Sequence, residues 1–330
     1  MGFVALALLA FFFKGADLGA IRKSLAEADL GLIAAAIAFV MVSYVLRARR
    51  WQVLLKPVGA ADMGACFVTT VIGFMFNFIA PTGRLGELVR PYLLARREGF
   101  SASSAFATIF LERIFDLVTV ILFVGVWLLL GPPPEGAKSE TAIQGLKVGG
   151  ITAFLATAVG LAIMFAFVRY RDRALTLARS LIRWFPGRLE PVAMRFLQNF
   201  GEGLGVLADG GNLARIGILS IALWLNIALV LWLGLSAFGI QLQFGATFLV
   251  LGFLVVGVAV PTPGAVGGYH VMFSLALTLL FGVDESRSQA AALVNHAIAF
   301  LPVTLLGMVF FIREGLSLKE VKTLESAGGG

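Results

Sequence analysis

A small group of charged side chains lies within an otherwise apolar segment, Ser103–Leu130. Glu112, Arg113 and Asp116 are the only charged residues in that segment. A charged side chain costs a few kcal/mol inside a bilayer even on lenient scales, so intramembrane ionisable residues are usually functional. Glu112 follows the candidate helix cap Ser101 at a distance of ~16 Å along a helix, near the middle of a ~30 Å hydrocarbon core. These residues are therefore candidates for binding a charged ligand within a membrane.

More charged side chains follow a Pro/Gly segment upstream, in PTGRLGELVRPYLLARR. Arg84, Glu87 and Arg90 recur there at i,i+3 spacing. Arginine offers phosphate a planar fork of donors, and a helix N-terminus adds backbone N–H groups. Arg84 and Arg90 could neutralise a lipid phosphate together with Arg113. Glu87 and Glu112 would then hold the arginines apart or take a coupling proton.

A second set of polar side chains lies in the C-terminal half. The segment PTPGAVGGYHV carries Tyr269 and His270, and Asn295 precedes His296 in the last apolar segment. Two histidines could shuttle protons, or they could hydrogen-bond carbonyl groups of the Pro/Gly segment. The candidate substrate-binding residues are Arg84, Glu87, Arg90, Glu112, Arg113, Asp116, Tyr269, His270, Asn295 and His296.

The composition places these residues in a membrane protein. Of the 330 residues, 59% are hydrophobic and 14% are charged, whereas soluble domains carry roughly 25% charged residues. The mean hydropathy is +0.94, and the long apolar runs lack two-residue alternation, which predicts helices rather than a barrel. The single cysteine, Cys66, excludes a disulfide framework and a multi-thiolate zinc site. We expect neither a metal nor a cofactor.

The apolar runs predict an all-α polytopic membrane protein with about six spans and two re-entrant hairpins, because a span needs about 20 apolar residues. The predicted spans are Gly2–Phe13, Leu30–Leu46, Ser103–Leu130, Val148–Val168, Ile216–Phe238 and Gln289–Ile312. Two shorter apolar stretches end in Pro/Gly segments, which is typical of re-entrant hairpins, here at 67–90 and 244–270. The whole chain, 1–330, is predicted to form one transmembrane domain.

Charge in the loops predicts the orientation. The loop after the second span, with Arg47, Arg49, Arg50 and Lys56, and the segment 169–215, with eight arginines against four acids, are basic. Basic loops face the cytoplasm, so both termini are expected inside and the protein is expected in the inner (plasma) membrane. The net charge of +7 is explained by this topology without a nucleic-acid surface. Apolar residues at helical spacing predict amphipathic cytoplasmic helices in 169–215.

The two halves of the chain follow one plan, which is span, hairpin with a Pro/Gly tip, short helix and span. From Gly99 and from Gly282 onward the halves match without a gap, and each match continues with a residue suited to cap a helix. An odd number of crossings between equivalent points predicts an inverted repeat of 30–130 and 216–312, typical of transporters. The residues expected to shape the hairpins are Asn77, Pro81, Gly83, Gly86, Pro261, Pro263, Gly264 and Gly267.

Four motifs in this sequence resemble a known family. They are YVLRARRWQVLL (Tyr44–Leu55), GFMFNFIAPTGRLGELVRPYLL (Gly73–Leu94), ERIFD (Glu112–Asp116) and PTPGAVGGYH (Pro261–His270). Over essentially its whole length the chain is similar to lysylphosphatidylglycerol synthase transmembrane regions, also called flippase-like integral membrane proteins. It departs from the family pattern at Tyr269–His270, where an acid is common, and at Asn295–His296, where an arginine is common.

The resemblance implies a stand-alone flippase-like unit, without the cytosolic aminoacyl-transfer domain of the fused members. The implied substrate is a phospholipid, a glycolipid or a polyprenyl-phosphate-linked lipid. An anionic membrane lipid is thus the expected partner, and homo-oligomer formation stays open.

Three functions compete. A flippase or transporter, rather than an enzyme, is favoured because it uses both the repeat and the midplane charges. A membrane-embedded lipid or polyprenyl transferase would need clustered carboxylates, and Arg113 flanks the pair Glu112 and Asp116. A role as the non-catalytic partner of a lipid-modifying enzyme would not explain the charged residues near the bilayer midplane. The alternative interpretation of Arg113 and Asp116 is a purely structural ion pair at i,i+3 spacing.

Overall fold

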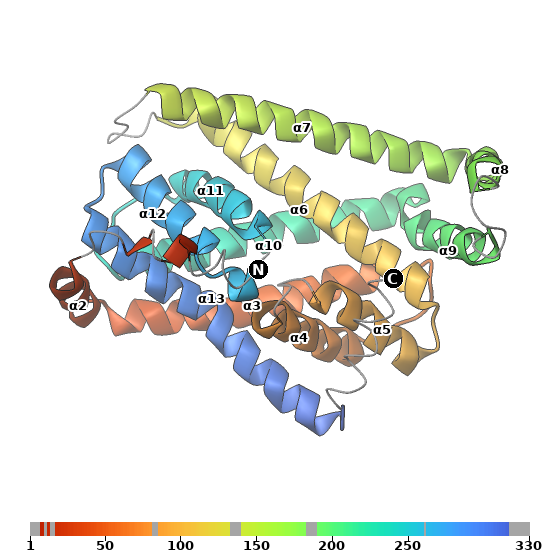
Figure 1. Cartoon of the computed structure of the whole chain (residues 1–330), viewed down its shortest axis with the longest axis horizontal. Helices are drawn as coiled ribbons and strands as arrows, with labels where there is room; N and C mark the ends of the chain where they lie inside the picture. Colours follow the sequence, from red (N-terminus) through yellow and green to blue (C-terminus); the bar gives the residue numbers. More distant parts are fainter. Residues whose placement is uncertain are drawn as a thin grey trace.

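A computed structural model of the chain describes residues 7–9, 12–13, 17–80, 85–132, 140–182, 190–260 and 262–316. Within these ranges the regular structure is entirely helical, as predicted, and contains no strand (Figure 1). The α-helices are α2 (Leu18–Ala26), α3 (Leu30–Leu54), α4 (Met63–Ile79), α5 (Gly86–Glu98), α6 (Ala102–Leu130), α7 (Glu140–Arg169), α8 (Arg171–Ile182), α9 (Glu190–Gly203), α10 (Gly210–Ser236), α11 (Thr247–Ala259), α12 (Gly268–Phe281) and α13 (Glu285–Arg313). Short 3₁₀ turns precede α10, α11 and α12.

Five described helical stretches are long and apolar enough to cross a membrane. Three of them, α3, α6 and α13, contain predicted spans, and α10 ends at Ser236, two residues before the end of the predicted span Ile216–Phe238. The fifth, Pro263–Phe281, includes α12 and overlaps the end of the segment that the sequence assigns to the second hairpin. The predicted span Val148–Val168 lies within α7, whereas most of the predicted span Gly2–Phe13 lies outside the described residues.

Helix α3 is longer than predicted. It continues to Leu54, so the prediction that Arg47, Arg49 and Arg50 lie in a loop is wrong. No proline or glycine interrupts the sequence there before Pro57, and the arginines can therefore extend the helix. Consecutive helical residues point about 100° apart, which leaves Arg49 exposed and buries Arg50 completely.

Glycine contacts close two helical hairpins, α4–α5 and α11–α12. A Cβ atom added to Gly86 would lie 1.7 Å from the carbonyl oxygen of Gly73. In the second hairpin, a Cβ atom on Gly268 would lie 2.3 Å from the carbonyl oxygen of Gly257. Any side chain at these contacts would push the helices apart, so each hairpin depends on glycine for its close approach.

The helix boundaries that follow the hairpins confirm the predicted stop and cap signals. Gly99 and Gly282 end α5 and α12 in the left-handed conformation, with φ of 76° and 63°. Ser101 and Asp284 then cap α6 and α13 by accepting hydrogen bonds from backbone N–H groups. The units α3–α6 and α10–α13 thus share one order of elements, and each ends in a helix of 29 residues.

The first helices of these units, α3 and α10, pack against each other in opposite directions. The backbone N–H of Asp29, before α3, donates to the carbonyl of Ala237, after α10, at 2.9 Å. At the other end, Lys56 Nζ donates to Asn212 Oδ1 at 2.7 Å. Helices α6 and α13 also run in opposite directions (Figure 1).

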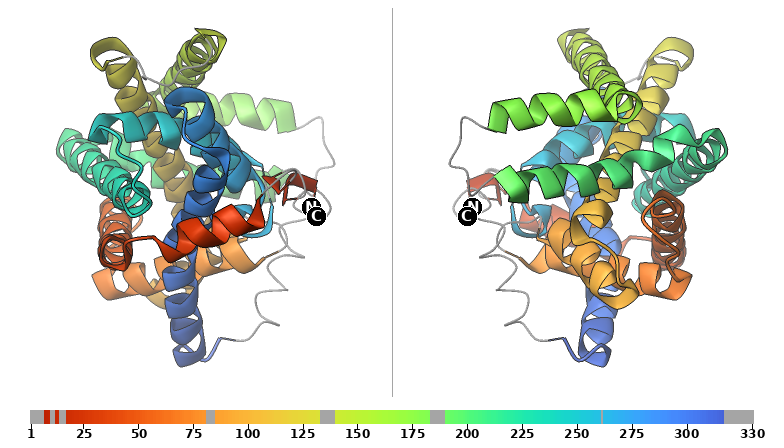
Figure 2. Two further views of the ribbon diagram at one scale, coloured as in Figure 1. Left: turned by 90° about the vertical axis from the view of Figure 1, so that its left-hand side faces the viewer. Right: turned by 90° about the vertical axis from the view of Figure 1, so that its right-hand side faces the viewer.

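Helix α7 forms one edge of the molecule, on the side of α6, with α8 and α9 at its C-terminal end (Figures 1 and 2). Helices α8 and α9 lie in the segment predicted to hold amphipathic helices. The charged residues discussed next lie away from this edge, between α3, α5, α6 and α10.

Candidate functional site

Arg50 of α3 lies between two carboxylates of α6. Its Nη1 is 2.8 Å from Asp116 Oδ1, and its Nη2 is 3.5 Å from Glu112 Oε1. The side chains of Arg50 and Glu112 are completely buried, and that of Asp116 is 9% exposed. A buried charge that lost its partner would destabilise the fold by about 3–5 kcal/mol, so these pairs fix how α3 packs on α6.

Arg90 of α5 pairs with Glu112 from another side. Its Nη1 lies 3.1 Å from both carboxylate oxygens of Glu112. Its guanidinium carbon lies 3.9 Å from the centroid of the Trp51 ring, and the indole N–H of Trp51 donates to Thr108 Oγ1 at 2.8 Å. A carboxylate at one edge and an aromatic face on one side therefore hold Arg90 in place.

Arg113 connects the buried charges to the surface. Its Nη2 is 3.1 Å from Glu112 Oε1, and its Nη1 is 3.7 Å from Asp116 Oδ2. The i,i+3 pair expected from the sequence is therefore present. Its Nε lies 3.9 Å from Glu87 Oε1, and the two side chains are 36% and 28% exposed. The charges are thus reached from outside by way of Arg113 and Glu87.

Helix α10 supplies uncharged partners to the same ion pairs. Arg50 Nη1 donates to Ser220 Oγ at 3.0 Å, and Trp224 Nε1 donates to Asp116 Oδ1 at 3.0 Å. Both α10 side chains are nearly or fully buried. The packing of α3, α6 and α10 is therefore coupled to the geometry of Arg50 and Asp116.

We refer to the six charged residues as the charged cluster. They are Arg50, Glu87, Arg90, Glu112, Arg113 and Asp116. Three guanidinium groups face three carboxylates, so the formal charges cancel. Arg47, one turn before Arg50, makes no ion pair within 4.0 Å with a described residue and lies over the Phe74 ring at 4.9 Å.

The arginines of the charged cluster carry more donors than its carboxylates use. Among the described residues, the Nε and Nη2 atoms of Arg50 and Arg90 and the Nε of Arg113 are buried without a hydrogen-bond acceptor. Leaving a buried donor unpaired costs about 1–3 kcal/mol. The cluster therefore holds guanidinium donors without acceptors, and a phosphate oxygen matches the fork geometry of arginine.

The structure brings together five of the candidate residues predicted from the sequence. They are Glu87, Arg90, Glu112, Arg113 and Asp116. Arg84 and the predicted hairpin residues Pro81, Gly83 and Pro261 lie outside the described residues. Asn77 lies beside the closed α4–α5 contact, since a Cβ atom on Gly86 would be 2.7 Å from its Oδ1.

The polar residues of the second half form a separate group. His296 Nε2 lies 2.8 Å from the carbonyl oxygen of Gly264. The ring centroid of His296 is 4.9 Å from that of Tyr269 and 4.6 Å from that of His270. Within the described part of the chain, no hydrogen bond or ion pair joins these three side chains to the charged cluster.

Asn295 and the remaining predicted hairpin residues have structural contacts. Asn295 Nδ2 donates to the carbonyl of Ala291 at 2.9 Å, and its Oδ1 would lie 2.0 Å from a Cβ atom on Gly234. Asn295 therefore fits α13 closely against α10. Pro263 begins the 3₁₀ turn of the second hairpin tip, and Gly264 and Gly267 adopt φ of 62° and 89° there.

Sequence reasoning missed the members of the site that lie on α3 and α10. Arg50, Trp51, Ser220 and Trp224 were not among the candidates. Arg50 looked like one of several loop arginines near a span end. The absence of a helix breaker before Pro57 was the signal that could have placed it on a helix face with Arg47, three residues earlier.

The sequence of the chain matches known proteins over nearly its whole length. Residues 2–307 match the model of a family described as "Lysylphosphatidylglycerol synthase TM region". A protein of Haloferax volcanii named Glycosyltransferase AglD is 28% identical over 324 residues, which cover 89% of this chain and 50% of that protein. The chain thus spans about half the length of that relative.

Two relatives of similar length come from Methanothermobacter thermautotrophicus, and each is named UPF0104 membrane protein. They are 27% and 26% identical to this chain, of which they cover 88% and 97%. The matches cover 85% and 95% of the relatives themselves. Because the family model covers the charged cluster and both hairpins, the chain belongs to the family of lysylphosphatidylglycerol synthase transmembrane regions.

Proposed function

We propose that the protein is a flippase-like lipid transporter that binds an anionic headgroup at the charged cluster and moves it across the bilayer. The headgroup belongs to a phospholipid, a glycolipid or a polyprenyl-phosphate lipid. The observation that carries this proposal is the surplus of buried guanidinium donors on Arg50, Arg90 and Arg113. A cluster that served packing alone would leave fewer of these donors without acceptors.

Exchange of partners gives the cluster a way to bind and release a phosphate. In the structure, Glu112 accepts hydrogen bonds from Arg90 and Arg113 and lies close to Arg50. A phosphate that enters past Arg113 can accept from free guanidinium edges while the carboxylate keeps part of its contacts. Charge-assisted bonds from the arginines to the phosphate replace some of their bonds to the Glu112 carboxylate. The charges therefore stay paired within the membrane both with and without the phosphate.

The arrangement of the two units supports movement around this site. Their opposed first helices, the two glycine-closed hairpins and the matching cap signals fit an inverted repeat, which in transporters lets one half gate toward each side. The halves also meet where Gly307 of α13 approaches α4, since a Cβ atom there would lie 3.0 Å from the Val71 carbonyl. We infer that the contacts of α3 with α10 and of α4 with α13 change as the site opens.

The same arrangement supports an orientation. The C-terminal end of α3 and the N-terminal end of α10 lie together and carry basic residues, including Arg49, Lys56 and Arg215. Such an end is expected at the cytoplasmic face of the inner membrane, with both termini in the cytoplasm.

A second candidate function is a membrane-embedded lipid transferase. The name of the Haloferax relative, Glycosyltransferase AglD, favours it. In this chain, however, the two buried acids of the cluster are already paired with arginines. Among the described residues there is also no group of three or more His, Cys, Asp or Glu side chains placed to hold a metal ion. Transport uses the observed ion pairs directly, and we therefore prefer it.

Reconstitution in liposomes tests the transport proposal. Fluorescent anionic phospholipids placed in both leaflets are bleached from outside, and the fraction that becomes accessible reports flipping. Arg90→Gln should slow flipping about tenfold or more, because it removes one partner of a buried charge pair. Arg97→Gln on the same helix should leave the rate unchanged, since Arg97 lies at the surface and pairs with Glu314. Equal flipping rates in wild type and a folded Arg90→Gln protein would refute the assignment of the charged cluster as the lipid site.

A further inference from the structure

A second concentration of basic side chains lies outside the charged cluster, in a groove between α3 and α10. We refer to it as the basic groove. Its cavity volume is about 690 Å³, and Arg49, Lys56 and Arg215 line it together with Val53, Ile218 and Leu219. No carboxylate is among its lining residues. The volume lies within the roughly 300–1,000 Å³ range of small-ligand sites.

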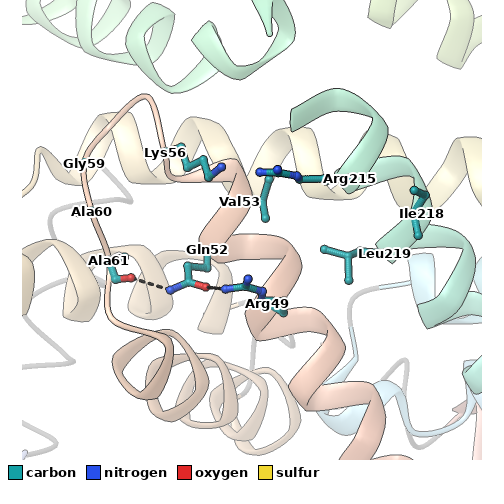
Figure 3. A pocket seen from close by; sticks show the side chains of 10 residues that line it. All are labelled: Arg49, Gln52, Val53, Lys56, Gly59, Ala60, Ala61, Arg215, Ile218 and Leu219. Atoms are coloured by element: carbon teal, nitrogen blue, oxygen red, sulfur yellow. Dashed lines mark hydrogen bonds between the residues drawn. The ribbon is translucent and has the colours of Figure 1, made fainter. Parts of the chain in front are cut away.

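Two of the three cations that line the basic groove point into one space. Lys56 and Arg215 extend toward each other above Val53 (Figure 3). Lys56 is held at its position by the hydrogen bond to Asn212, 2.7 Å long. Like charges held near one another repel, and an anion between them removes that repulsion.

The wall of the basic groove is shaped by the chain that follows α3. Gln52 Nε2 donates to the carbonyl of Ala61 at 2.9 Å, and Gln52 Oε1 accepts a hydrogen bond from Arg49 Nη1 (Figure 3). Gln52 therefore ties the loop before α4 to the helix and keeps Arg49 beside the groove. The opposite wall is apolar, and Ile218 is 67% exposed there.

Neighbouring residues on α3 and on α10 face the basic groove and the charged cluster respectively. Arg49 lines the groove while Arg50 points into the cluster, and Leu219 lines the groove while Ser220 bonds Arg50. Only the contact between α3 and α10 therefore divides the two. None of the cations that line the groove belongs to the charged cluster, so separate variants can test the two sites.

We propose that the basic groove binds the phosphate headgroup of an anionic phospholipid from the surrounding leaflet. Lys56 and Arg215 supply positive charge for the phosphate, and exposed apolar surface beside them accommodates the start of the acyl chains (Figure 3). A soluble phosphate compound would use the cations but not Ile218. The ligand class is therefore a lipid, and the site is a peripheral one, at the basic end of α3 and α10.

Native mass spectrometry of the detergent-solubilised protein tests the groove. The protein is titrated with phosphatidylglycerol and, separately, with zwitterionic phosphatidylcholine. Lys56→Gln/Arg215→Gln should lower phosphatidylglycerol affinity about tenfold, because two charge-assisted contacts are lost. The matched control, Arg22→Gln/Lys23→Gln, removes the same charge from exposed positions on α2 and should bind like wild type. Phosphatidylcholine binding should be weak and equal in all three proteins.

Two other outcomes would each contradict the proposed lipid site in the basic groove. Equal loss in both double variants would show that net charge alone attracts the lipid. Displacement of phosphatidylglycerol by inorganic phosphate at low ionic strength would show that the ligand is a soluble anion. Arg90→Gln should leave groove binding intact, so failure of the transport assay and failure of the groove are separable. Thermal unfolding of each variant confirms that it is folded.

Discussion

The guanidinium carbon of Arg90 lies 3.9 Å from the centroid of the Trp51 ring, and both side chains are buried. Trp51 follows Arg50 directly, so one turn of α3 contributes both a buried cation and the aromatic face that supports a second one. The indole is itself fixed by its bond to Thr108. The orientation of Arg90 therefore depends on α3 and α6 as well as on its own helix, α5.

Replacing Trp51 tests this support. Trp51→Leu removes the aromatic face and leaves a cavity, and we expect loss of about 3 kcal/mol of stability together with slow lipid flipping. Trp51→Phe keeps a ring and loses the bond to Thr108, so both effects should be smaller. Thermal unfolding in detergent and the liposome assay measure the two effects. Equal flipping in wild type and Trp51→Leu would show that Arg90 needs no aromatic support.

Glu112 is the acid on which three arginines converge, and Glu112→Gln should destabilise the protein. The neutral amide leaves Arg50 and Arg90 buried without their shared counter-charge, which should cost about 3–5 kcal/mol. Glu27→Gln is the control, because Glu27 is 64% exposed and its pair with Lys23 should contribute little. Denaturant unfolding in detergent compares the two variants. A change of the same size in both would mean that Glu112 is not held in a low-dielectric site.

The close contact of Gly86 with Gly73 predicts that Gly86→Ala opens the first hairpin. The new Cβ atom would meet the Gly73 carbonyl, and we expect a loss of about 3 kcal/mol or more. Gly125→Ala in α6 should change stability by no more than about 1 kcal/mol, since nothing lies within 4 Å of its added Cβ atom. The thermal unfolding midpoints decide the comparison. A stable, active Gly86→Ala protein would contradict the observed helix packing.

His296 is expected to hold the second hairpin tip and not the lipid. His296→Gln keeps a side-chain donor for the Gly264 carbonyl and should flip lipid at nearly the wild-type rate. His296→Leu loses the bond and should be about 1 kcal/mol less stable. The liposome assay and thermal unfolding test both variants. Loss of flipping in a folded His296→Gln protein would instead place the second-half polar group at the substrate.

The sequence predicted the parts of this fold that depend on local signals. Gly99 with Ser101 and Gly282 with Asp284 mark helix ends through backbone conformation and capping, which are readable along the chain. The long apolar runs likewise predicted α6 and α13. The pairing of Glu112 with Arg90 needed a contact between α5 and α6, and only the charge of each residue hinted at it.

What could not be predicted depended on which way a helix faces. Arg49 and Arg50 are adjacent and chemically identical, and only the packing of α3 shows that one is exposed and the other buried. Ser220 and Trp224 are ordinary residues of an apolar span, and their role follows from the position of α10. Glu112 and Asn295 lie equally far beyond the caps of their helices, Ser101 and Asp284, but depth does not specify the direction of a side chain.

The length of α3 before Arg50 sets the rotational phase of the helix. Inserting one residue after Asp29 would turn everything beyond it by about 100° relative to the fixed N-terminal end. Arg49 would then take the place of Arg50, while Arg50 would take that of Trp51. The cluster would keep a cation at the position of Arg50 but lose the ring beneath Arg90, and the groove would lose Arg49. A single inserted residue would thus alter two sites at once, although the composition and hydropathy of the span would hardly change.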